Sequence, residues 1–184
     1  AAKRWDLLQT EVAFDPGKKV IVAGTLTASG TTFEATTPSS GWGGIRQTGG
    51  ATTLTNVSKI DGGGVTVLGG TFYLDGSVLQ DAGMYVSGSS TVAVVQNGSL
   101  MQDAPGTGIY AENGADVRVR GVDTIIQRSG YRAALARGVG TRILFSDWAT
   151  SFSNPAGAAS VIYGEAAFAG NPSLGPVTMD LNTY

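Results

Sequence analysis

GSVLQDA at residues 76–82 and GSLMQDA at residues 98–104 are two copies of one seven-residue pattern, displaced by 22 residues. A looser copy, TIIQ, follows at residues 124–127. The apolar position of the pattern continues in both directions, at spacings of 22 to 28 residues, and its members are Leu26, Leu54, Val78, Leu100, Ile125 and Phe152. A recurrence of this length, in a chain with few helix signals, is typical of a solenoid with one coil per repeat.

Short segments of alternating polarity lie between glycine, asparagine and serine corners, as in VTV at residues 65–67. Stacked coil on coil at ~4.8 Å, such strands form parallel sheets around one core. The sequence therefore predicts an all-β fold, a single-stranded parallel β-helix of six to seven coils, wound right-handed as parallel crossovers usually are. One domain is expected, with a cap at 1–11, coils at 12–153, and an irregular last coil or C-terminal wrap at 154–184. Residues 131–137 are expected to form one turn of helix.

The amino-acid composition argues against several classes of function. The 184 residues carry a net charge of −2 and only 14% charged residues, which gives no reason to expect a nucleic-acid partner. Histidine and cysteine are absent, so thiol chemistry, disulfides and the commonest transition-metal ligand are excluded. The sequence contains no run of 18 apolar residues, so it does not predict a membrane-spanning helix. The absence of cysteine fits a secreted or cell-surface protein of bacterial type.

Three segments resemble a known family: FDPG at 14–17, VIVAGTLTA at 20–28 and GWGGI at 41–45. They are similar to the right-handed parallel β-helix modules of large bacterial surface and secreted proteins, in which a strand ending in G-T-L-x-A precedes a W-G-G-I coil. The resemblance is clear over residues 12–61 and looser over 62–150. It implies a fold shared by pectate-lyase-like enzymes, phage tailspikes, adhesins and stalks, so it specifies function poorly.

Asp81 and Asp103 are the polar pair that most strongly suggests a functional site, because they are one coil apart and their carboxylates are expected to lie about one strand spacing from each other. Stacked acids suit Ca²⁺ binding or acid/base cleavage of a sugar chain, and Arg128 on the next rung would neutralise them or bind an acidic sugar. The alternative is an amide ladder of Gln80, Gln102 and Gln127 with solvated acids beside it.

Two further rows are candidate partner faces. If Val78 and its counterparts point inward, then Leu79, Met101 and Ile126 form an outward apolar stripe that the C-terminal segment or another chain would cover. The alternative is a corner tight enough for both residues to face the core. Three tyrosines, Tyr73, Tyr85 and Tyr110, are expected to form an outward aromatic ladder suited to sugar stacking, or else simple sheet packing.

We therefore expect a non-catalytic extracellular or cell-surface module, a stalk, scaffold or adhesive segment of a larger secreted protein. Its expected partner is a polysaccharide or another protein chain, and no cofactor is expected beyond a weak Ca²⁺ candidate at Asp81 and Asp103. The alternative is a lyase or hydrolase acting on an acidic polysaccharide, with Asp81, Asp103 and Arg128 as its site.

Overall fold

The computed structural model describes residues 3–37, 41–120, 124–146, 151–153 and 162–164, and every regular element in these residues is a β-strand. The strands form three parallel sheets of seven strands each, here called A, B and C. Sheet A contains β1 (Arg4–Leu8), β4 (Thr25–Ser29), β7 (Ala51–Thr55), β10 (Gly70–Asp75), β13 (Thr91–Gln96), β16 (Asp116–Arg120) and β19 (Arg142–Ser146). Sheet B contains β2 (Glu11–Phe14), β5 (Thr32–Ala35), β8 (Lys59–Asp61), β11 (Val78–Gln80), β14 (Leu100–Gln102), β17 (Ile125–Gln127) and β20 (Ser151–Ser153). Sheet C contains β3 (Val20–Val22), β6 (Ile45–Gln47), β9 (Val65–Val67), β12 (Met84–Ser87), β15 (Thr107–Glu112), β18 (Arg132–Arg137) and β21 (Ile162–Gly164).

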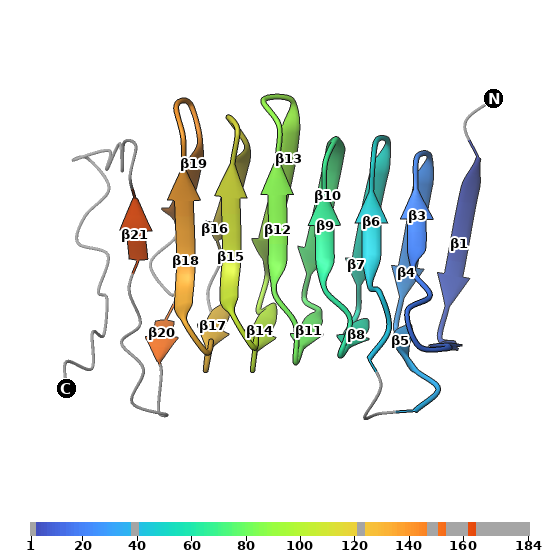
Figure 1. The fold of residues 1–184 in the computed structure, drawn as a ribbon. Helices are drawn as coiled ribbons and strands as arrows, with labels where there is room; N and C mark the ends of the chain where they lie inside the picture. The colour runs from blue at the N-terminus through green and yellow to red at the C-terminus, as the bar shows by residue number, and fades with distance from the viewer. Residues whose placement is uncertain (1–2, 38–40, 121–123, 147–150, 154–161, 165–184) are drawn as a thin grey trace.

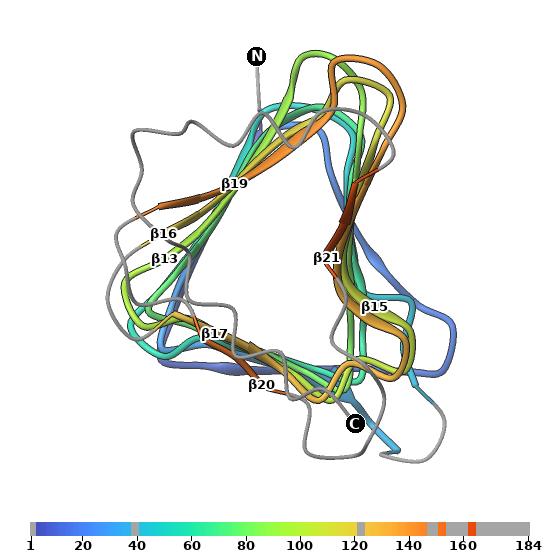
Figure 2. The same cartoon turned by 90° about the vertical axis from the view of Figure 1, so that its left-hand side faces the viewer.

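The chain winds through the sheets in the order A, B, C and returns to sheet A one rung further on. The sheets form the sides of a triangle (Figure 2), and the rungs follow one another along the molecule from β1 to β21 (Figure 1). The predicted all-β parallel solenoid is confirmed, and seven strands per sheet agree with six to seven coils. The right-handed winding stays a prediction. In the part of the chain that is described, no helix has the length and hydrophobicity of a membrane span.

The core lies inside the triangle and consists of alternate residues of each strand, because successive side chains of a strand point to opposite faces of the sheet. One inward column on sheet A is at most 8% exposed from its second rung to its seventh, and consists of Leu26, Thr52, Phe72, Ala93, Val117 and Ile143. The large ring of Phe72 lies between the small side chains of Thr52 and Ala93, as close packing requires. Neighbours in the core are therefore residues one coil apart in the sequence.

The corner between sheets A and B carries a buried hydroxyl at five successive rungs, which we call the hydroxyl column. Its members are Thr31, Ser58, Ser77, Ser99 and Thr124. Ser99 Oγ lies 2.6 Å from the carbonyl oxygen of Gln96 and 2.9 Å from that of Leu74, and the amide of Ser77 donates to it at 3.3 Å. These short side chains satisfy backbone groups that the turn leaves without strand partners.

The register corrects the alignment of the first two repeats. Leu26 and Leu54 lie on sheet A, where they pair with Thr52 and Ala28, whereas Val78 lies on sheet B. They are therefore not rungs of one column. The sequence alignment was wrong there because the Thr-Leu-Thr strands of sheet A share the polarity of the sheet B strands, and composition alone does not separate the sides of a triangle.

One expected element was wrong: the helical turn predicted at 131–137 is instead strand β18. Within the expected cap at 1–11, Arg4–Leu8 form strand β1, which pairs with β4 on sheet A. Within the predicted last coil or wrap at 154–184, β21 pairs with β18 on sheet C, and the rest of this segment lies outside the described residues.

Candidate functional site

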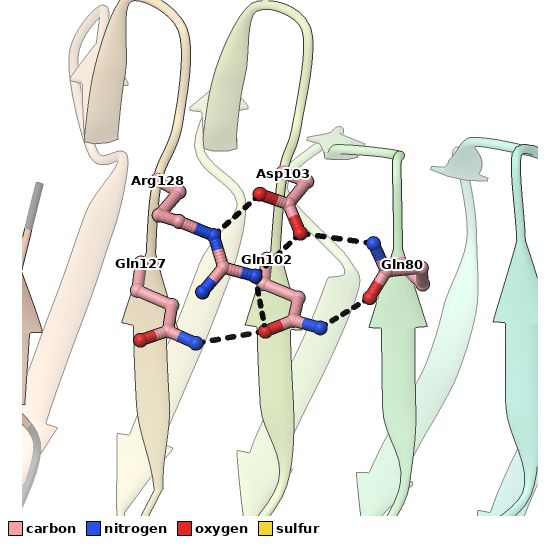
Figure 3. Close-up of polar contacts among 5 residues, drawn as sticks. All are labelled: Gln80, Gln102, Asp103, Gln127 and Arg128. Atoms are coloured by element: carbon pink, nitrogen blue, oxygen red, sulfur yellow. Dashed lines mark hydrogen bonds and ion pairs between the residues drawn. The ribbon is translucent and has the colours of Figure 1, made fainter. Parts of the chain in front are cut away.

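The candidate site is the outer face of sheet B near the corner that leads to sheet C. Here the predicted amide ladder is confirmed: Gln80, Gln102 and Gln127 occupy successive rungs in exact register. Gln127 Nε2 donates to Gln102 Oε1 at 2.7 Å, and Gln102 Nε2 donates in turn to Gln80 Oε1 (Figure 3). Each amide can donate to one neighbour and accept from the other, so identical side chains at the strand spacing form a continuous chain of hydrogen bonds.

The residue after each glutamine has a left-handed backbone. The φ angles are 53° at Asp81, 57° at Asp103 and 52° at Arg128, and the equivalent glycine, Gly62, has a φ of 66°. This turn ends the sheet B strand, and its amide still bonds the next rung, as from Asp81 to the carbonyl of Gln102 at 3.0 Å. Aspartate tolerates this conformation better than most side chains, which gives a structural reason for the repeated Gln-Asp pair.

Asp103 and Arg128 form a two-pronged ion pair. Arg128 Nε donates to Asp103 Oδ1 and Arg128 Nη2 to Asp103 Oδ2, each at 2.5 Å (Figure 3). Gln80 Nε2 donates to Oδ2 as well, at 2.9 Å. The hydrogen bonds from Arg128, with that from Gln80, lower the pKa of Asp103 from 3.8 to about 2. The predicted neutralisation of Asp103 by the arginine on the next rung is therefore present.

Asp81 does not share this pair. Its side chain is exposed, and Arg128 contacts the carboxylate one rung away, at Asp103. In the described residues, no group of three or more acidic side chains is placed to hold a metal ion. Asp103 is ionised and both its oxygens accept hydrogen bonds, so it is poorly suited to donate a proton at neutral pH.

The prediction of an outward apolar stripe was wrong. Leu79, Met101 and Ile126 are at most 1% exposed and lie in the core. The outward row consists instead of their half-buried neighbours Val78, Leu100 and Ile125, which pair in register. We call these three the apolar row.

The phase of the strand explains the error. Because Ser77 and Ser99 point into the corner, the next residue points outward and the one after it inward. Residues two apart share a face, so an outward Gln80 requires an outward Val78. The glutamine positions in the sequence therefore indicate which side chains of these sheet B strands face outward.

The tyrosine ladder is present for two of its three members. Tyr85 and Tyr110 pair on sheet C, with ring centroids 5.5 Å apart in an edge-on arrangement. Tyr73 lies on sheet A beside Thr53 and Val94, so its inclusion was wrong. Sequence spacing alone did not separate the two sheets.

Glu112, which the sequence reasoning missed, joins the two tyrosines. It accepts hydrogen bonds from the hydroxyl of Tyr85 and, at 2.6 Å, from that of Tyr110. These bonds raise the pKa of both phenols and lower the pKa of Glu112. The signal was its position two residues after Tyr110, on the same face of β15.

A second missed cluster lies on the outer face of sheet A. Asp116 Oδ2 accepts hydrogen bonds from Arg118 Nη2 at 2.7 Å and from Arg142 Nη2 at 2.8 Å. The two guanidinium groups, with that of Arg142 contributing most, lower the pKa of Asp116 from 3.8 to about 2. Asp-x-Arg on one strand was the available signal, because residues two apart lie side by side on one face.

No protein-family model, curated protein or solved structure matches this chain.

Proposed function

We propose that this chain is a non-catalytic β-solenoid module, which acts as a stiff stalk or scaffold and presents an adhesive outer face. We place it outside the cell or on its surface, as a segment of a larger secreted protein of bacterial type. The main observation that supports this proposal is that three seven-stranded sheets share one stack of rungs.

A stack of this kind resists bending, because each rung is hydrogen-bonded to the next on all three sides of the triangle. Seven rungs at ~4.8 Å span roughly 30 Å. The core columns run along the same axis, so bending would open hydrophobic contacts as well as backbone hydrogen bonds. This supports a mechanical role.

The outer face of sheet B supports the adhesive part of the proposal. The apolar row Val78, Leu100 and Ile125 runs beside the row of glutamines, one strand spacing per rung. A flat surface that combines apolar contact with regularly spaced amides suits an extended partner with a repeating structure. A polysaccharide or another protein chain has this character.

The alternative, a lyase or hydrolase of an acidic polysaccharide, would use Asp81, Asp103 and Arg128. The ion pair between Asp103 and Arg128 argues against this alternative. Each side chain is already bound to the other, whereas an enzyme would need both to be available to the substrate. A general acid also needs a raised pKa, whereas that of Asp103 is lowered to about 2.

Limited proteolysis tests the stiff rod. Arg46 lies within β6 and Arg118 within β16, and both are sites for trypsin. We expect both bonds to survive under conditions that digest an unfolded chain, because a protease must first extract the strand from the sheet. Mass spectrometry of the fragments gives the measurement, and early cleavage at either site would contradict a rigid stack.

Incubation with pectin and alginate, with and without Ca²⁺, separates the two functions. We expect the wild type to release neither unsaturated sugars, which a lyase would produce, nor new reducing ends, which a lyase or a hydrolase would produce. Release that disappears in the variant Asp103→Asn, with the protein still folded, would overturn the proposal in favour of the enzyme. Binding to immobilised acidic polysaccharides should weaken in Leu100→Asp and not in the control Val139→Asp, which changes a side chain 93% exposed at another corner.

A further inference from the structure

The charged side chains of sheet A are concentrated on two of its strands. β4, β7 and β13 carry no charge, β10 carries one aspartate, and β1 carries one charge of each sign. By contrast, β16 and β19 together carry three arginines and one aspartate, namely Arg118, Arg120, Arg142 and Asp116. These side chains alternate with core residues, so they lie on the outer face of the sheet. This part of the surface is positively charged, although the whole chain has a net charge of −2.

Asp116 is shared between two of the arginines. Its Oδ2 accepts hydrogen bonds from Nη2 of both Arg118 and Arg142, and its Oδ1 accepts one from Arg142 Nε at 2.9 Å. Two guanidinium groups therefore lie against one carboxylate, which neutralises only one of their two charges. The remaining positive charge favours a second anion beside them. The pair of Asp103 with Arg128 differs in this respect, because there one carboxylate faces one guanidinium group.

The three arginines retain hydrogen-bond donors for such an anion. Arg118 and Arg142 contact Asp116 through Nε and Nη2, so Nη1 of each group is not engaged by that carboxylate. Their side chains are 41% and 58% exposed. Arg120 donates from Nε to Gln96 Oε1 at 2.9 Å, and an amide does not neutralise its charge. A guanidinium group presents five donors in a planar fork that matches a carboxylate, and the contact of Arg142 with both oxygens of Asp116 is an example of that fit.

We propose that the outer face of β16 and β19 binds carboxylate groups of an acidic polysaccharide, at a site separate from the outer face of sheet B. This inference rests on the proposed function in taking a polysaccharide as the partner, and it names the chemical class of that polysaccharide. Arg118 and Arg120 lie two residues apart on β16, roughly 6.6 Å along the strand, so they offer separate contacts to neighbouring acidic sugars. Tyr73 lies on the same outward column as Arg118, two rungs before it, and its ring provides an apolar surface for a sugar.

Titration calorimetry with oligogalacturonate, a short chain of uronic acids, tests this site at low ionic strength, where charge pairs are least screened. We expect Arg142→Gln to weaken binding about tenfold, through the loss of a charge-assisted contact. Arg142→Lys keeps the charge without the planar fork and should bind with intermediate affinity. Arg120→Gln should also weaken binding, and it leaves the contacts of Asp116 intact, so a loss there does not come from a disrupted cluster.

Two controls match these variants. Arg46→Gln removes the same charge from an exposed position on sheet C and should bind as the wild type does. The fully methyl-esterified oligomer keeps the sugar chain without its negative charges and should not bind. A wild type that does not bind oligogalacturonate would overturn the proposal, as would an equal loss in Arg46→Gln or equal affinity for the esterified oligomer. Equal affinity for dextran sulfate or a single-stranded oligonucleotide would overturn the assignment to a uronic-acid chain.

The assay with immobilised acidic polysaccharides separates this site from the adhesive face of sheet B. We expect both Leu100→Asp and Arg142→Gln to weaken that binding, because they alter different sides of the triangle. A loss in Leu100→Asp alone would overturn the site on sheet A and leave the proposed face of sheet B in place. A loss in Arg142→Gln and Arg120→Gln alone would support the site on sheet A and remove the adhesive role of sheet B.

Discussion

Among the residues that the structure describes, Val57 has the backbone conformation that conflicts most with its side chain. Its φ of 62° lies in the left-handed region, where a β-branched residue is an outlier, and it is 72% exposed. The corner Asn56-Val57-Ser58 has a counterpart two rungs on in Asn97-Gly98-Ser99, where Gly98 adopts a φ of 76°. The molecule therefore contains both the strained and the relaxed version of one turn.

We expect Val57→Gly to raise the free energy of unfolding by about 0.5–1 kcal/mol, since the left-handed conformation costs ~1–2 kcal/mol and glycine recovers it at some entropic cost. Urea denaturation followed by circular dichroism provides the measurement. The reciprocal variant Gly98→Val should lose stability by a similar amount. Equal midpoints for all three proteins would contradict the strain at this turn.

At the scale of the element, the hydroxyl column decides how each sheet A strand turns into sheet B. A serine inside the corner forces the next side chain outward, and this sets the phase of the whole sheet B strand. The same phase places Met101 in the core and Leu100 on the surface. Consequently Met101→Asp would test core stability, and only an outward residue such as Leu100 tests the adhesive face.

Ser99→Ala should destabilise the fold by about 1–2 kcal/mol, because the amide of Ser77 and the carbonyls around Ser99 lose a buried partner. Ser89→Ala is the matched control, since Ser89 is exposed at the corner between sheets C and A that precedes β13. Thermal and urea melts of both variants measure the difference. A loss of the same size in the control would show that the hydroxyl column contributes nothing particular.

For the whole molecule, the ion pairs connect successive rungs and so couple stability to pH. Asp103 pairs with Arg128 across one rung, and Asp116 with Arg142 across another. Their pKa values are lowered from 3.8 in the unfolded chain to about 2 in the folded one. The resulting stabilisation is complete above pH 3.8 and is lost as the pH falls through 2.

We expect the free energy of unfolding to fall between pH 4 and pH 2 by about 1 kcal/mol for each of these two carboxylates, after allowance for solvent screening. Denaturation curves at fixed ionic strength measure the slope. The double variant Asp103→Asn with Asp116→Asn should be less stable at pH 7 and should have a flatter profile below pH 4. Parallel profiles would exclude these pairs as the source of acid sensitivity.

The sequence by itself determined the class of fold, since the 22-residue recurrence of Gly-Ser-x-x-Gln-Asp-Ala places identical residues on successive rungs, and identical amides then bond along the stack. It also indicated the Gln80, Gln102 and Gln127 ladder and the pairing of an aspartate with Arg128. Which side of the triangle each strand occupies, and which of two adjacent apolar residues faces inward, was decided only by the tertiary structure. The physical reason is that strands of all three sheets share one alternating pattern, so their assignment depends on how the corners turn and on which residues one coil away fill the same core.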